Sequence, residues 1–79
     1  MALHPLVKQS ADLAIELDSK GVSTDLICNA INLVTVLPDN QAIESALNEL
    51  EQIAHSQEEI SDAWWLHKTT EVYRKYKAR

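Results

Sequence analysis

Residues that form turns are scarce in this 79-residue chain, which holds one glycine, Gly21, and two prolines, Pro5 and Pro38. Proteins built from many short strands need a turn every few residues, and glycine and proline are the usual residues at such turns. The scarcity therefore favours a few helices joined by short loops. Because a folded unit typically needs about 50 to 200 residues, the sequence predicts one helical domain over residues 1–79.

Apolar residues recur at helical spacing in three segments, which predicts three amphipathic helices. The first runs from about residue 5 to 19, the second from about 24 to the residue before Pro38, and the third follows a cap at Asp39 or Asn40. The apolar positions are Leu6, Val7, Ala11, Leu13, Ala14 and Leu17; then Leu26, Ile27, Ala30, Ile31, Leu33, Val34 and Leu37; then Ile43, Ala46, Leu47, Leu50, Ile53 and Ala54. We expect the second to be the most buried helix.

A fourth helix is predicted from a capping box at Ser56 and Glu59, where a serine is followed three residues later by a glutamate. It would run nearly to the C-terminus. Together the segments predict an all-α fold, a small bundle of about four helices with short loops and antiparallel neighbours.

The fourth helix carries apolar residues on two opposite faces, and one helix cannot bury both against a single small core. Its first half groups Ile60, Ala63, Trp64 and His67, and the opposite stripe is Trp65, Thr69, Val72 and Tyr76. If the first group faces the core, the opposite stripe faces outward. We then expect a partner protein or a second copy of the chain to bury it. The alternative is that the two rings of the stripe fill the chain's own core.

Charge is divided unevenly along the chain. Residues 1–66 hold eleven acidic residues against Lys8 and Lys20, and residues 67–79 hold five basic residues against Glu71. Acidic side chains around the third and fourth helices predict a patch that engages a basic site on another protein, and a solvated helix surface is the alternative. The candidate residues are Glu51, Glu58, Glu59 and Asp62.

An antiparallel homodimer is predicted through the stripe, since it would place each basic C-terminal end near the acidic residues of the other copy.

A nucleic-acid-binding regulator is the competing interpretation. Residues 13–31 have the pattern of a helix-turn-helix motif with Gly21 in the turn. The second helix would present Asn29 and Asn32 to the bases of DNA. That helix has no lysine or arginine for phosphate, so its affinity would be poor, and the other possible site is the basic tail, Arg74, Lys75 and Lys77. Nucleic acid is therefore the less favoured partner.

Neither a metal nor a cofactor is expected. His4, His55, His67 and Cys28 match no zinc spacing, and four short helices leave little volume for a catalytic pocket. The single cysteine excludes an internal disulfide, and the chain shows no secretory leader pattern, which together favour the cytoplasm. Its longest nearly apolar run, residues 26–37, is shorter than the roughly 20 residues that cross a bilayer. We therefore expect a small non-enzymatic protein-binding module, such as a regulator, inhibitor or accessory subunit.

Overall fold

Four α-helices make up the fold, which is a computed structural model describing residues 5–78. They are α1 (Pro5–Ser19), α2 (Thr24–Thr35), α3 (Asn40–His55) and α4 (Asp62–Lys77), and residues 5–78 contain no strand. The predicted all-α bundle of about four helices is confirmed. His4, considered above as a metal ligand, lies outside the described residues.

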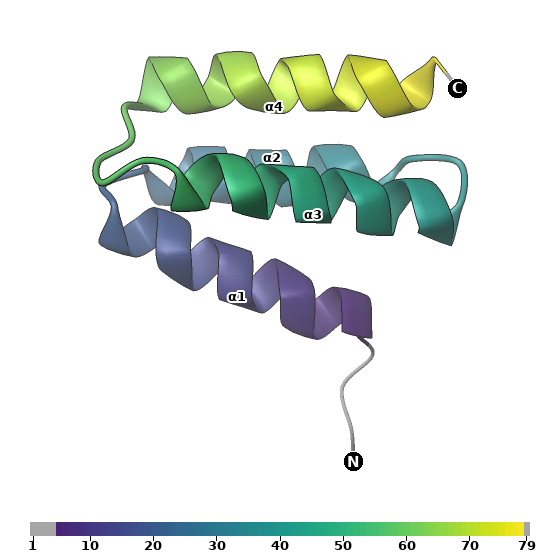
Figure 1. The fold of residues 1–79 in the computed structure, drawn as a ribbon, viewed down its shortest axis with the longest axis horizontal. Coiled ribbons are helices and arrows are strands. Elements are labelled where there is room, and N and C mark those ends of the chain that lie inside the picture. The colour runs from purple at the N-terminus through teal and green to yellow at the C-terminus, as the bar shows by residue number, and fades with distance from the viewer. Residues whose placement is uncertain (1–4, 79) are drawn as a thin grey trace.

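The helices form two stacked hairpins (Figure 1). Within each hairpin, α1–α2 and α3–α4, the two helices run antiparallel, as predicted. Between the hairpins, α1 contacts α3 and α2 contacts α4, and both of these pairs run in the same direction. The expectation of antiparallel packing concerns helices joined by a short loop, and all three consecutive pairs follow it; the parallel pairs are not consecutive in the chain. Because α2 and α4 are parallel, their N-termini share one end of the bundle.

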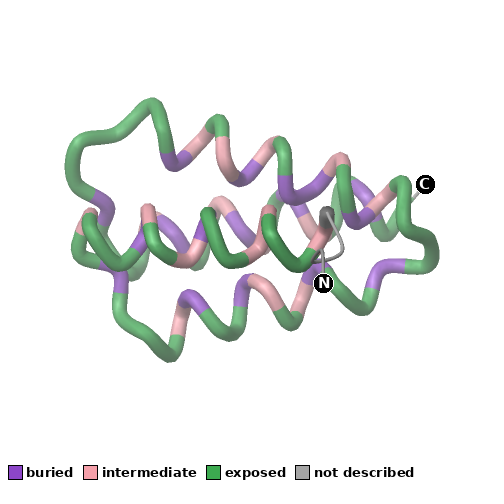
Figure 2. Tube along the Cα trace, turned by 90° about the horizontal axis from the view of Figure 1, so that it is seen from below, coloured by how far each residue is buried: buried purple, intermediate pink, exposed green. Residues whose placement is uncertain are grey.

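The core lies between the two hairpins, where buried residues from every helix face inward (Figure 2). Helix α3 supplies five of them, and α2 supplies Ile27, Ala30 and Val34. The expectation that α2 is the most buried helix is wrong. Its apolar residues cover nearly half of its circumference, which is wider than the side facing the core, so Leu26 and Leu33 remain half-buried at the surface.

Helix α4 begins at Asp62 rather than at the predicted capping box. Its N-cap is Ser61, whose hydroxyl accepts from the Trp64 N–H at 3.2 Å. Ser56 instead ends α3, and its hydroxyl donates to the Ile53 carbonyl. Ile60 therefore enters the core from the preceding link and not from the helix. This leaves α4 free to turn a different face inward.

The two hairpin turns are tied together at one end of the bundle. Gly21 stops α1 with φ of +98°, a left-handed conformation that glycine adopts without strain. The Ile60 N–H donates to the Lys20 carbonyl at 3.1 Å. A carboxylate oxygen of Asp62 accepts from the N–H of Ser23, the N-cap of α2, at 2.9 Å. One aspartate thus serves the N-terminal ends of both α2 and α4.

Candidate protein-binding surface

The predicted partner-facing stripe of α4 lies in the core of the single chain. Trp65 is 0% exposed and Tyr76 is 7% exposed, with Thr69 and Val72 buried between them along the helix. The Thr69 hydroxyl donates to the Trp65 carbonyl at 2.8 Å. The stripe is therefore unavailable to a partner or second copy in this fold, and the open alternative that the rings are core residues is the one observed.

The opposite side of α4 points outward, which reverses the predicted orientation. Ala63 and His67 are exposed, and Trp64 is half-buried beneath Lys68, whose Nζ lies 5.7 Å from the centre of a Trp64 ring. The physical reason is the position of Ile60. Ile60 reaches the core from the link that precedes α4. The α4 residues predicted to share its face therefore do not have to turn inward with it.

A groove lined mainly by apolar residues lies between α2 and α4. We define the α2–α4 groove by its lining residues, Leu26, Asn29, Ala30, Leu33, Trp65, Leu66 and Thr69. Leu66 stands at its edge with 52% of its surface exposed. The hollow measures about 30 Å³, roughly the space that one water molecule or methyl group occupies. A single apolar side chain from outside would fill it.

Trp65 also lines this groove and carries an unsatisfied polar atom. Its indole Nε1 is buried and has no hydrogen-bond partner among the described residues. A buried donor without a partner costs about 1–3 kcal/mol, so most native proteins avoid one. This cost falls on a residue that also lines the α2–α4 groove.

The exposed side of α2 is almost free of charge. Across its twelve residues Asp25 is the only ionisable group apart from the thiol of Cys28, although 24% of the whole chain is charged. The residues that α2 presents to solvent besides Asp25 are Thr24, Cys28, Asn29, Asn32 and Thr35, followed by Val36 at 70% exposure. Interface cores are depleted of charged residues in the same way. Sequence reasoning missed this surface, and its signal was the uncharged run from residue 26 to 37.

The predicted acidic patch is divided by the structure. Glu58, Glu59 and Asp62 are exposed near the start of α4, but Asp62 is engaged with the Ser23 N–H. Glu51 lies elsewhere, half-buried on α3 in a hollow that it shares with residues of α1. The four residues therefore do not form one surface. Acids gather at the N-termini of α2 and α4 because the helix dipoles favour negative charge there.

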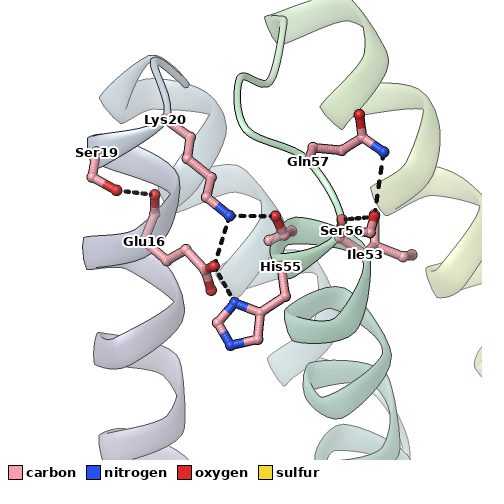
Figure 3. Close-up of polar contacts among 8 residues, drawn as sticks. Glu16, Ser19, Lys20, Ile53, His55, Ser56 and Gln57 are labelled. Atoms are coloured by element: carbon pink, nitrogen blue, oxygen red, sulfur yellow. Dashed lines mark hydrogen bonds and ion pairs between the residues drawn. The ribbon is translucent and has the colours of Figure 1, made fainter.

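A network of polar contacts at the same end joins α1 to α3 (Figure 3). The Lys20 ammonium donates to a carboxylate oxygen of Glu16 at 2.9 Å and to the Ala54 carbonyl at 2.6 Å. His55 contacts the same Glu16 oxygen. Burial alone would raise the pKa of Glu16, but the hydrogen bonds from Lys20 and His55 outweigh it and the pKa is lowered. The side chains of Glu16, Lys20 and His55 therefore connect α1 to α3, and their contacts within the chain occupy them.

Glu51 gives a prediction about pH. Burial raises the pKa of this carboxyl, and the nearby carboxylates of Asp12 and Glu16 raise it further. A raised folded-state pKa means that the ionised group opposes folding at neutral pH, and that this cost disappears as pH falls through the folded pKa and below the unfolded one. Glu51→Gln should therefore raise the melting temperature at pH 7 and have little effect near pH 3. Thermal unfolding followed by circular dichroism measures both.

Glu44→Gln, at an exposed site on the same helix, is the control, and an equal gain in both variants would contradict this explanation.

The groups of the nucleic-acid alternative lie on two helices that contact each other. Asn29 and Asn32 lie on α2, whereas Arg74, Lys75 and Lys77 lie at the C-terminal end of α4, away from the turn at Gly21 (Figure 1). The Lys75 ammonium pairs with Glu49 at 2.7 Å. The Lys77 Nζ lies 5.4 Å from the centre of the Tyr73 ring. The turn of the predicted helix-turn-helix and the basic tail therefore lie at opposite ends of the bundle, and two of the three basic groups are engaged by other side chains.

Comparison with known proteins gives no relative, since no family model, curated protein or solved structure matches the chain. None of the four helices is both long enough and apolar enough to span a membrane within residues 5–78. Over the same residues, no three His, Cys, Asp or Glu side chains are grouped so that they would hold a metal ion.

Proposed function

We propose that this chain is a small non-enzymatic protein-binding module whose partner docks on the α2–α4 groove and the adjoining uncharged side of α2. The observation that carries the proposal is this combination of surfaces: Leu66 exposed at the edge of an apolar hollow, beside a helix with one charged residue. A helix or loop that inserts an apolar side chain into such a groove is a common mode of peptide and protein recognition.

The energetics favour a partner of modest affinity. Covering the exposed half of Leu66 and the half-buried Leu26 and Leu33 removes apolar surface from water, which stabilises a complex by about 25 cal/mol for each Å². Exposed carboxylates at the N-terminal end of the groove, Asp25 and Asp62, would steer the approach of a basic surface. The exposed free thiol of Cys28 suits a reducing compartment, so we place this activity in the cytoplasm.

Binding can be tested by comparing proteins retained from lysate of the native cells by the wild type, Leu66→Asp and Ile15→Asp. Ile15 is 69% exposed on α1, which does not contact α4 among the described helices, so Ile15→Asp is a matched control. A charge at position 66 should reduce retention of a specific protein at least tenfold, because an unpaired carboxylate would be buried on docking. The control should retain it fully. Equal retention by both variants, or retention of nucleic acid alone, would overturn the proposal.

A further inference from the structure

We infer that the occupant of the α2–α4 groove is a second copy of this chain, related by a two-fold axis that runs the two grooves antiparallel. The inference rests on the proposed function, because it uses the same groove and names the partner that docks there. It differs from a dimer through the buried stripe of α4, which the fold excludes.

Charge along the α2–α4 face supports this partner. Asp25 and Asp62 lie at the shared N-terminal end of α2 and α4, and Arg74 and Lys77 lie toward the C-terminal end of α4. The two helices run in the same direction (Figure 1), so the acidic residues fall at one end of the face and the basic residues at the other. An antiparallel two-fold pairing places each acidic end against the other copy's basic end, and a parallel pairing places like charges together.

The apolar part of the face also has the repeat that a helix pair requires. Leu66 and Tyr73 are seven residues apart on α4, and Lys77 follows after four, so the three share one side of the helix. Tyr73 is half-buried against the core, and the Lys77 ammonium lies over its ring at 5.4 Å. The basic group therefore sits at the end of the apolar row, in line with the groove edge at Leu66.

The size of the chain is sufficient for such a dimer. A standard protein interface uses about 800 Å² from each partner, which is about a sixth of the 5140 Å² accessible surface of this chain. A two-fold interface is self-complementary, since each groove meets the same groove. Domains of this length have a limited core, and burying a shared apolar face adds to their stability.

The test is a pair of charge reversals, Asp25→Lys and Lys77→Glu, examined by sedimentation velocity at low salt. Each variant alone would place like charges together at both ends of the dimer, so we expect dissociation constants at least tenfold higher than that of the wild type. A mixture of the two variants restores opposite charges at both contacts and should form a heterodimer. Asp18→Lys is the matched control, because Asp18 is an exposed acid on α1 at the same end but away from the groove.

Circular dichroism must show that the variants remain helical, and Asp25→Asn, which removes the same charge without reversing it, replaces Asp25→Lys if that variant unfolds. Recovery of a dimer in the mixture but in neither variant alone would support the inference. A wild type that is monomeric at several hundred micromolar would overturn it. If that monomer still retains a protein that Leu66→Asp loses, the proposed function stands and only the second copy is rejected. A dimer unaffected by Leu66→Asp and both reversals would show that the copies meet elsewhere.

Discussion

Replacing Trp65 by alanine is expected to lower the free energy of unfolding by about 3–5 kcal/mol, the usual cost of truncating a buried aromatic side chain to alanine. This is a large share of the total stability of a domain of this length, since native proteins hold about 0.05–0.15 kcal/mol per residue. Trp65 is 0% exposed and is the largest fully buried side chain in the described core. Urea unfolding followed by circular dichroism measures the change.

Trp64→Ala is the matched control for this prediction, because it removes the same side chain one position earlier on the helix. Trp64 is only half-buried, and we expect a loss of about 1 kcal/mol or less. The order of the two effects depends on which face of α4 turns inward. Similar losses for both variants, or a Trp65→Ala chain that is fully stable, would show that the orientation of α4 is wrong.

Lys20→Met is expected to cost about 2–3 kcal/mol, the second-largest effect. The ammonium donates to the Glu16 carboxylate and to the Ala54 carbonyl near the C-terminal end of α3, and hydrogen bonds involving charged groups contribute about 1.5–3 kcal/mol each. Methionine keeps much of the apolar stem but removes both donations. It leaves a carboxylate that is largely buried with His55 as its remaining partner at that oxygen.

Lys8→Met is the control, since Lys8 is an exposed cation on the same helix, and its replacement should change stability by less than about 0.5 kcal/mol. Urea unfolding at pH 7 measures both variants. If Lys20→Met is as mild as Lys8→Met, the contacts between α1 and α3 at this end do not hold the hairpins together. A deficit that becomes smaller in the Glu16→Gln background would support the explanation, because the neutral amide no longer needs the cation and only the donation to the Ala54 carbonyl is then lost.

The helices themselves could be predicted from the sequence, because their information is local. Gly21 and Pro38 mark two interruptions, and the repeat from Ile43 to Ala54 identifies both the length and the inward side of α3. The sequence predicts the start of α4 too early, because Ser56 and Glu59 match the capping-box pattern although the cap that forms is Ser61. Both Ser56 and Ser61 could cap the helix, and the sequence does not say which one does. The choice follows from the position of Ile60, which enters the core from the link before α4.

The candidate surface could be predicted only in part, because an apolar pattern does not say what covers it. The run from residue 26 to 37 predicts a buried helix, yet the structure buries one side and leaves Leu33 and Val36 partly or largely exposed. The sequence predicts a partner for Asp62, whereas its hydrogen bond to the Ser23 N–H depends on a contact between residues 39 positions apart. Long-range contacts of this kind have no signature in local spacing.

The most direct measurement of the central claim, that the α2–α4 side of the bundle binds protein, uses the native thiol. Cys28 is the only cysteine and is exposed on α2, so a benzophenone maleimide can be attached there without altering the sequence. The control carries the same group at Ile15→Cys in a Cys28→Ser background. On irradiation in lysate of the native cells, we expect a discrete protein adduct from position 28, either a second copy or another chain, and none from position 15. Adducts from position 15 alone, or equal adducts from both, would contradict the claim.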